Sequence, residues 1–413
     1  MSNMFIYLIP FILGSYNKSN SKKVTAANIT NRKIFGSEKE ELIQVIVSGT
    51  DFNDEEKHIQ GIGSVKYKLP MINSYVVEVP KSKIGQLRNI KGIKKVEQDA
   101  HITAQMNVAR ESINCRWALE NNITGRGIGV AVLDTGIYPH KDLTGRRNRI
   151  LAFKDFVNNH NEPYDDNGHG THVTGIIGGD GYSSSGKYMG IAPDCHFIGV
   201  KVLDDKGAGN ISDVLAGLQW VIDNKEKYNI KVVNISVGTE DKDGEGETSA
   251  LVRGVDAVWD NNLVVIVAAG NNGPRTMSIT TPGISRKIIT VGSSDDKETV
   301  NIFGENITNY SGRGPTSNCI KKPDVIAPGS NIVSCNTDKK YKSGVIQDVG
   351  YTTKSGTSMA TPIISGAVAL LLSRHRNISN RDIKLKLKES TVDLGFIQSH
   401  QGWGMIDIKK LLS

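Results

Sequence analysis

Four polar residues, each at the edge of an apolar run or between glycines, have the types that nucleophilic attack on a carbonyl requires. Asp134 ends an apolar run and precedes Thr-Gly, which favours a carboxylate at the end of a buried parallel strand. Asn271 follows a second apolar run, His169 stands between two glycines, and Ser358 precedes a long apolar segment. Serine, histidine and aspartate can act together as nucleophile, general base and orienting group, and an asparagine amide can hold an oxyanion.

Ser358 lies in Gly-Thr-Ser-Met-Ala-Thr-Pro, residues 356–362, and this heptapeptide predicts a sharp turn into a helix. Glycine and small residues allow the turn, and Pro362 suits the first helical turn, where its missing N–H costs little. Residues 363–372 are mostly apolar and predict a buried helix. A hydroxyl at the helix start would lie where developing negative charge is favoured. Taken alone, the pattern also fits an ordinary Ser/Thr helix cap.

His169 and His172 are three residues apart and would share one face of a helix. A metal-binding pair is one interpretation, and a metal hydrolase would follow from it. Because no HExxH pattern or cysteine cluster accompanies the pair, we favour His169 as a general base. Asp134 and Asn271 taken singly also fit ordinary turn residues, so it is their combination with His169 and Ser358 that indicates catalysis.

Five segments, in this order, resemble the motifs of the subtilisin-family serine endopeptidases, or subtilases. They are residues 131–136 (AVLDTG), 167–173 (NGHGTHV), 234–238 (NISVG), 267–271 (VAAGN) and 356–362 (GTSMATP). Residues 138–140, 153–157 and 162–166 are most similar to the intracellular-type bacterial alkaline subtilases. The resemblance covers nearly everything after about residue 105. It implies a peptide hydrolase that needs no cofactor for its chemistry, and an α/β fold with a doubly wound parallel sheet. Alternating strand and helix patterns after residue 128 predict the same sheet.

The resemblance implies a role for each residue. Ser358 would be the nucleophile, His169 would carry its proton, and Asp134 would orient His169. Asn271 and the Ser358 N–H would hold the oxyanion, while His172 would be structural. All four catalytic positions hold competent residue types, which argues against the alternative of a catalytically silent subtilase-like binding protein.

The resemblance also places the substrate, which would be a polypeptide. One segment would pair with it as an edge strand, and a second would form a wall of the primary side-chain pocket: Ser236, Val237, Gly238 and Ala268, Ala269, Gly270. Thr280 would stand near the pocket floor, where relatives often carry glycine. Asp142 matches a family calcium ligand, so a structural calcium is an expectation. Residues 178–187 lack the matching asparagine, and Asp180 could replace it or lie in a surface turn.

The chain divides into residues 1–40, 41–105 and 106–413. In the first segment, residues 4–14 are apolar but too few to cross a membrane, and they fit either a signal-peptide core or the first strand of a propeptide. We therefore favour a cytoplasmic location, with secretion as the alternative. Strand and helix patterns in 41–103 predict a small α+β domain. It resembles the inhibitory subtilase propeptide, so the chain would be a self-processing zymogen with residues 98–105 in the cleft. An unrelated N-terminal domain is the alternative.

Charge and cysteine content exclude several other classes. The 413 residues carry a formal net charge of +7, but the basic residues are scattered and predict no nucleic-acid surface. The four cysteines form no CxxC pair, so we expect free thiols without a zinc or redox motif. Residues 125–129 (GRGIG) precede a strand instead of following one, which does not fit a dinucleotide site. No transmembrane segment is expected.

Overall fold

The computed structural model describes residues 42–50, 56–98, 101–104, 111–239, 246–297, 299–302 and 305–413, and the backbone alone of residues 98 and 101–104. All of them belong to one unit of the chain, Glu41–Ser413. The interpretations of residues 1–40 lie outside the described residues, as does the expected cleavage junction at 105–106. The domain boundaries at 40 and 105 therefore stay predictions.

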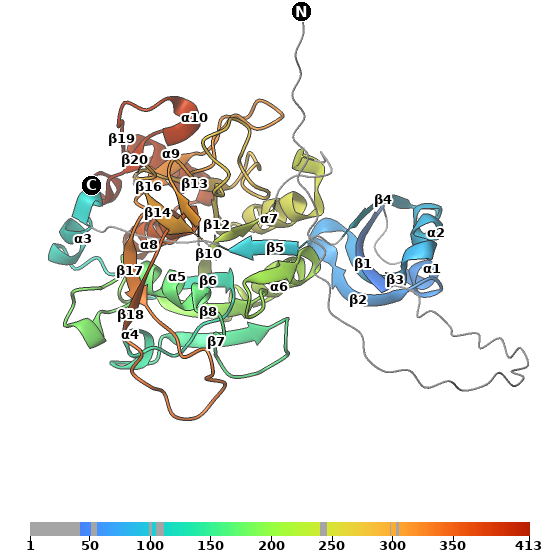
Figure 1. The fold of residues 1–413 in the computed structure, drawn as a ribbon, viewed down its shortest axis with the longest axis horizontal. Helices are drawn as coiled ribbons and strands as arrows, with labels where there is room; N and C mark the ends of the chain where they lie inside the picture. Colours follow the sequence, from blue (N-terminus) through green and yellow to red (C-terminus); the bar gives the residue numbers. More distant parts are fainter. Residues whose placement is uncertain are drawn as a thin grey trace, which may run out of the picture. The chain divides into compact units, whose positions relative to one another are not determined.

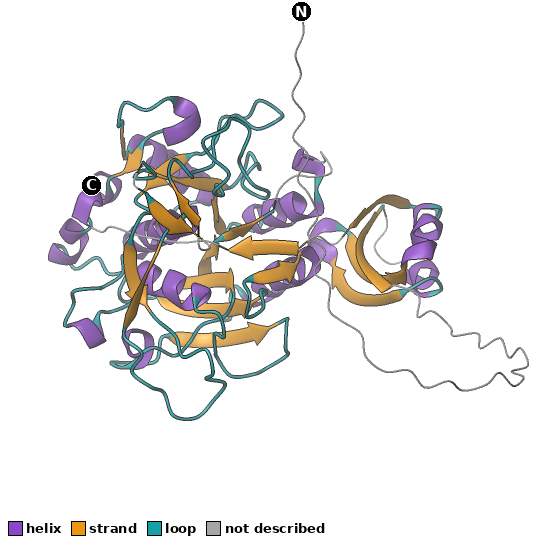
Figure 2. Cartoon of the chain, viewed as in Figure 1, coloured by secondary structure: helices purple, strands orange, loops and turns teal. Residues whose placement is uncertain are grey.

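A nine-stranded sheet forms the centre of residues 111–413, called the larger part of this unit below (Figures 1 and 2). In spatial order its strands are β19 (Thr391–Val392), β20 (Met405–Ile406), β16 (Val325–Ala327), β13 (Ile289–Ser293), β12 (Val264–Ala268), β10 (Ile230–Ile235), β6 (Gly129–Asp134), β8 (His196–Lys201) and β7 (Ile150–Asp155). Neighbouring strands are parallel, except that β19 and β20 are antiparallel. Every residue of β6 and β12 is buried, as expected where helices cover both faces. The predicted parallel sheet is confirmed.

Two pairs of helices cover the two faces of this sheet. Helices α5 (His169–Gly178) and α8 (Thr357–Arg374) contact each other, as do α6 (Ile211–Asn224) and α7 (Ala250–Asp260). Ser365 of α8 donates to Asn234 at 2.7 Å, whereas the next row of the sheet, which includes Leu133, faces Gly217 of α6. Because successive side chains of a strand point to opposite faces, α8 and α6 lie on opposite sides. The other α-helices of the larger part are α3 (Arg116–Glu120), α4 (Lys141–Thr144), α9 (Asn380–Glu389), α10 (Gln398–Gln401) and α11 (Ile408–Leu412).

Helix α8 is the core helix of the larger part. Its residues from Thr357 to Leu372 are all buried, as the apolar run predicts. Among the described residues it is the one helix long and apolar enough to cross a membrane, and 89% of it is buried inside the protein. That burial is what a core helix of a folded domain shows.

A second, four-stranded antiparallel sheet lies within residues 42–98. Its order is β2 (Ser64–Leu69), β3 (Ser74–Pro80), β1 (Leu42–Gly49) and β4 (Ile93–Gln98), with the short helices α1 (Glu56–Gln60) and α2 (Ile84–Arg88). Successive side chains of these strands point to opposite faces of the sheet. Val45, Val47, Val77 and Val79 form a separate small core, while Ile46 and Val76 join the main core. The small sheet thus packs one face against its own helices and the other against the larger part.

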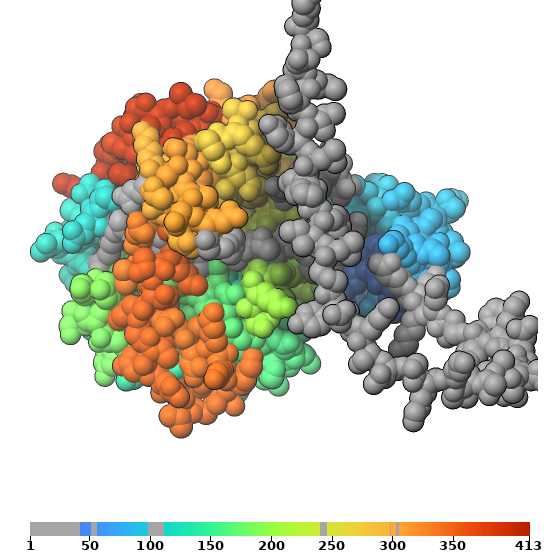
Figure 3. Space-filling view, viewed as in Figure 1, coloured from blue at the N-terminus to red at the C-terminus, as the bar shows by residue number. Residues whose placement is uncertain are grey.

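A third sheet, of three short antiparallel strands, is formed by segments far apart in sequence. Its order is β11 (Val237–Gly238), β5 (His101–Ala104) and β9 (Ala208–Asn210). Figure 1 shows β5 directed from the small sheet toward the larger part. Two further antiparallel pairs are β14 (Val300–Ile302) with β15 (Glu305–Ile307) and β17 (Ile332–Cys335) with β18 (Tyr351–Lys354). The segment between β17 and β18 lies at the surface (orange in Figure 3).

Candidate active site

Asp134 and His169 form a buried, directly bonded pair. Asp134 is the last residue of β6, and His169 is the first residue of α5. His169 Nδ1 contacts Asp134 Oδ1, which also accepts the Thr135 N–H at 2.7 Å. A Cβ at Gly170 would lie 2.1 Å from Gly136 O and 3.1 Å from Asp134 Cβ, so only glycine lets the helix start approach the strand end this closely. The geometry leaves His169 Nε2 as the ring nitrogen that does not face Asp134.

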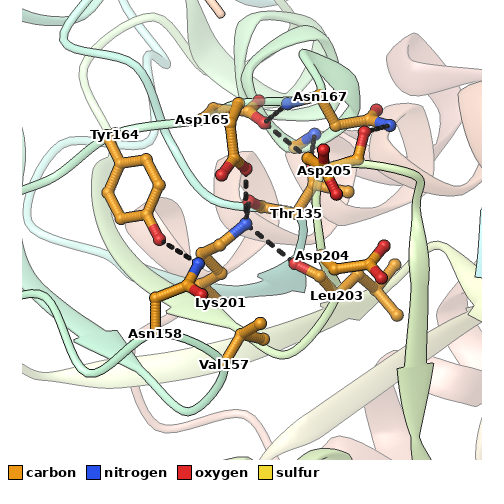
Figure 4. A network of polar contacts seen from close by, with 12 residues as sticks. Thr135, Val157, Asn158, Tyr164, Asp165, Asn167, Lys201, Leu203, Asp204 and Asp205 are labelled. Atoms are coloured by element: carbon orange, nitrogen blue, oxygen red, sulfur yellow. Dashed lines mark hydrogen bonds and ion pairs between the residues drawn. The ribbon is translucent and has the colours of Figure 1, made fainter. Parts of the chain in front are cut away.

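Asp165 fixes the start of α5, and so fixes His169. Its carboxylate accepts the N–H groups of Gly168 at 2.8 Å and Thr171 at 2.9 Å, and the hydroxyls of Thr135 at 2.9 Å and Thr171 at 2.6 Å. Asp165 and Thr135 are labelled in Figure 4. Burial alone would raise the pKa of Asp165, but these hydrogen bonds outweigh it, and the pKa is lowered. A carboxylate at a helix N-terminus is favoured by the helix dipole and satisfies N–H groups that lack intrahelical acceptors.

Lys201 is fully buried at the end of β8 and holds the turn after Asp134. Its Nζ donates to Thr135 O at 2.5 Å, to Leu203 O at 2.8 Å and to Asp166 Oδ1 at 2.7 Å. Figure 4 shows the ammonium group pointing toward the Thr135 and Leu203 backbone. A buried charge is tolerated when it is paired and hydrogen-bonded, and here that pairing fixes the segments on both sides of the Asp134–His169 pair.

Ser358 lies in the first turn of α8, as predicted, and is 3% exposed. Its hydroxyl donates to Ser236 O at 2.8 Å, and the Ser236 hydroxyl donates to Ser358 O at 3.0 Å. Gly356, which precedes the helix, has a φ of 145°, a conformation suited to glycine. This reciprocal pair of bonds places Ser358 directly beside the end of β10.

The Asn271 amide is oriented by Thr357, the residue before Ser358. Asn271 Oδ1 accepts both the N–H and the hydroxyl of Thr357 at 3.0 Å, and the Thr357 hydroxyl accepts the Gly270 N–H at 3.1 Å. Two donors require an oxygen at this position, so Nδ2 points the other way. Asn271 Nδ2 is buried and has no hydrogen-bond partner among the described residues. A buried unpaired donor is costly, which indicates a position awaiting an acceptor.

The extended segment β5 lies in a groove beside Ser358. Thr103 and Ala104 pair with Gly238 and Val237 of β11, and residues 101–103 pair with β9 on the other side. Ser236, whose carbonyl accepts the Ser358 hydroxyl, directly precedes β11. A stretch of peptide backbone therefore occupies a two-sided β groove next to a serine hydroxyl.

Comparison with known proteins agrees with this geometry. A sequence profile of the subtilase family matches residues 125–404. The chain belongs to the subtilase family. It is 41% identical over 340 residues to the serine protease AprX of Bacillus subtilis, covering 79% of this chain and 76% of that protein. It is 30% identical over 330 residues to the thermostable alkaline protease of Halalkalibacterium halodurans, covering 79% of each. This subtilase is therefore a serine protease, a hydrolase of peptide bonds.

A solved structure shows the same fold. Fervidolysin of Fervidobacterium pennivorans, a keratinolytic enzyme related to subtilisin, matches with a TM-score of 0.71 at 23% identity. The match covers 90% of this chain and 61% of that one. At this identity the likeness speaks for the fold alone.

Thr280 packs against both segments that the resemblance assigns to substrate. Thr280 N donates to Ala269 O at 3.0 Å, and Thr239 and Thr281 form a β bridge, so the three segments lie side by side. A Cβ at Gly238 would lie 2.6 Å from Thr280 Oγ1, and one at Gly270 would lie 2.4 Å from Thr280 Cγ2. The Thr280 side chain thus fills the space between the two segments that the resemblance assigns to substrate.

The remaining candidates of the sequence do not enter the site. His172 is fully buried, its Nε2 lies 3.1 Å from Thr352 O and 3.2 Å from Ile332 O, and burial lowers its pKa well below the ordinary value. Asp142, also fully buried, lies near His140 and Cys335. Calcium requires oxygen ligands, whereas this group offers a thiol and an imidazole, and the Asp142 oxygens already accept protein donors. The donor set beside Asp142 does not fit a calcium ion.

The sequence interpretation missed several contributors, Asp165 and Lys201 among them. Strand β9 forms the second side of the groove, and its signal is Gly207-Ala208-Gly209, whose small residues leave room for another backbone. Thr357 orients Asn271, and that role becomes visible only when β12 and α8 are brought together.

Proposed function

We propose that this subtilase cleaves peptide bonds through Ser358, His169 and Asp134, and that it is made as a self-processing zymogen. The observation that carries the proposal is that residues 101–104 pair with β11 and β9. Strand β11 directly follows Ser236, whose carbonyl oxygen accepts the Ser358 hydroxyl. Extended substrates bind proteins by adding such a strand, where backbone pairing gives affinity and side-chain pockets give preference.

The reaction begins when the Ser358 hydroxyl turns from Ser236 O toward His169. Ser358 Oγ attacks the carbonyl carbon while its proton passes to His169 Nε2, and the carbonyl oxygen becomes an oxyanion. Asn271 Nδ2 and the Ser358 N–H, in the first turn of α8, donate to that oxygen. The Asp134 carboxylate stabilises the imidazolium form of His169.

Collapse of the tetrahedral intermediate breaks the C–N bond, and His169 gives its proton to the leaving amine. The acyl group stays on Ser358. Water then repeats the sequence: His169 takes its proton, the hydroxide adds to the ester carbonyl, and Ser358 leaves with the proton returned from His169.

Contacts between the small sheet and the larger part support an inhibitory propeptide. Glu97 Oε1 accepts the Ala250 N–H at 2.6 Å, at the start of α7, and Oε2 pairs with Arg253 at 3.0 Å. Tyr67 donates to Asp213 at 2.9 Å, at the start of α6. Carboxylates at helix starts are stabilised by the dipole, so the small sheet docks on two helices while its tail fills the groove.

The test compares wild type with Ser358→Ala. Wild type should be cut near residues 105–106, whereas Ser358→Ala should stay full length and lack peptidase activity, as read by intact-mass spectrometry and N-terminal sequencing. Fluorophosphonate should add to the mature wild type at Ser358 and not to the variant. A wild type that neither reacts with the probe nor cleaves peptides would favour the catalytically silent binding protein. Cleavage that persists in Ser358→Ala without added protease would refute self-processing.

A further inference from the structure

Arg149, directly before β7, places its guanidinium in the interior at the far end of the helix that begins with His169. Arg149 is 2% exposed. Nη1 donates to Gly178 O at 2.5 Å and to Cys195 O at 3.1 Å, and Nη2 donates to Asp142 O. Asp142 lies in α4, Gly178 is the last residue of α5, and Cys195 directly precedes β8. One cation therefore joins three separate segments.

This position suits a positive charge for two reasons. The last carbonyls of a helix lack intrahelical donors and carry partial negative charge, so a cation at Gly178 O stabilises the end of α5. The planar guanidinium presents several donors in a fixed fork and can serve three carbonyls at once. The Phe197 ring, 5.4 Å from the guanidinium carbon, lies against it.

The acidic side chains nearby are already bound by protein donors. Asp142 accepts the Ser183 N–H at 2.8 Å and the Tyr351 hydroxyl at 2.9 Å. Asp180 accepts the Tyr182 N–H at 2.9 Å and pairs with Arg146 at 3.7 Å. Both carboxylates therefore already have protein partners.

Three backbone oxygens near the end of α5 and in the loop after it accept protein donors as well. Ile177 O accepts the Ala192 N–H at 2.8 Å, Gly179 O accepts the Gly190 N–H at 2.7 Å, and Gly181 O accepts the Gly186 N–H at 2.9 Å. A calcium ion needs about 6–8 oxygen ligands, and these three oxygens and those of Asp142 would have to exchange existing donors to bind one.

We propose that the Arg149 guanidinium is the built-in structural cation of this subtilase and makes a calcium ion beside Asp142 unnecessary. The proposal concerns folding stability, so its test does not depend on the peptidase mechanism.

The test measures thermal unfolding of the full-length Ser358→Ala protein, which avoids self-digestion. Its Tm should be the same in excess EGTA and in millimolar calcium chloride. Arg149→Met in this background removes the guanidinium donor from Gly178 O and Cys195 O and leaves Asp142 O with the Asp180 N–H alone, so it should lower Tm by about 6 °C or more. Arg149→Lys keeps the charge without the fork and should give an intermediate loss.

Arg147→Met is the matched control, because Arg147 is two residues away, 48% exposed, and paired with Asp194 at 3.1 Å. It should lower Tm by about 2 °C or less. The proposal fails if Arg149→Met costs no more than Arg147→Met. It also fails if EGTA lowers the Tm of the parent by an amount that Asp142→Asn abolishes. A calcium effect on Tm that persists in Asp142→Asn arises elsewhere in the chain and does not contradict the proposal. If EGTA leaves the Tm of the parent unchanged and Arg149→Met is too unstable to purify, the proposal is supported.

Discussion

Replacing Asn271 by alanine should slow turnover far more than it weakens substrate binding. Asn271 Nδ2 is buried without a partner among the described residues, while Oδ1 is held by two donors from Thr357 at 3.0 Å. The amide is thus oriented before substrate arrives, and its N–H meets a strong acceptor only as charge develops on the carbonyl oxygen. An interaction made in the transition state alone raises kcat without lowering KM.

The magnitudes for catalysis and for folding differ widely. Loss of one oxyanion donor typically costs roughly 2.7–4 kcal/mol, which is about 10²–10³ in kcat. The same substitution removes the acceptor of both Thr357 donors, and two hydrogen bonds together contribute about 1–3 kcal/mol of folding stability. At about 2–4 °C per kcal/mol, the Tm should fall by at most about 12 °C. The variant should therefore be folded at assay temperature and still be nearly inactive.

The assay measures kcat and KM on a peptide p-nitroanilide, with Tm from scanning fluorimetry in the Ser358→Ala background. Thr357→Val is the control, because it removes one of the two bonds that orient Asn271 but leaves the Nδ2 donor in place. It should lower kcat by about 10-fold or less. A rise in KM with unchanged kcat in Asn271→Ala would show that the amide binds the ground state. Unchanged kinetics would mean that other donors hold the oxyanion.

Three further predictions follow from single contacts. Glu97→Gln should weaken inhibition of the mature enzyme by added propeptide by about 10- to 100-fold, because a nearly buried charge-assisted pair with Arg253 is lost. The control is Glu78→Gln, which changes an exposed residue and should leave inhibition unchanged. Equal inhibition constants for the two variants would contradict this prediction. Thr280→Gly should raise kcat/KM for phenylalanine over alanine at the primary position by roughly 10-fold or more, and an unchanged ratio would show that Thr280 does not limit the pocket. Because the folded-state pKa of Asp165 is lowered, its charge stabilises the fold above the ordinary value of about 3.9, and that stability is lost as pH falls through the lowered value. Asp165→Asn should therefore lower Tm at neutral pH and flatten the loss of Tm on acidification, and parallel curves of Tm against pH would refute this.

The sequence predicts well those features that depend on local patterns. The apolar runs of β6 and β12 predict buried parallel strands, and both strands lie in the sheet with every residue buried. The buried helix follows from its apolar run in the same way, but it begins at Thr357, so Pro362 lies in the second turn and not in the first as expected. Boundaries are less well predicted: α2 begins only at Ile84, because residues 81–83 form a tighter 3₁₀ turn.

What the sequence does not reveal depends on segments that meet only in the folded chain. Arg149 is a long charged residue before a strand, which in most proteins would be solvent-exposed. Its burial depends on carbonyls from α4, α5 and the segment before β8, and no local pattern predicts that they converge. Strand β9 has three residues, too few to show an alternating pattern, and becomes a strand because β5 pairs with it.

The positions of the groups proposed for catalysis follow from sheet register. Strands β12, β10 and β6 are adjacent and parallel, and Val267, Ile235 and Leu133 lie in one row. The next residue of each strand therefore falls in one row as well, which places Asp134 at the same edge as Ser236, the carbonyl partner of Ser358, and as Ala268 before Asn271. Rows are about 3.3 Å apart along parallel strands, so a slip of one residue would move Asp134 by that distance and turn it to the other face. The apolar side chains that fix the register are therefore as necessary to the geometry of the site as the polar residues that extend from it.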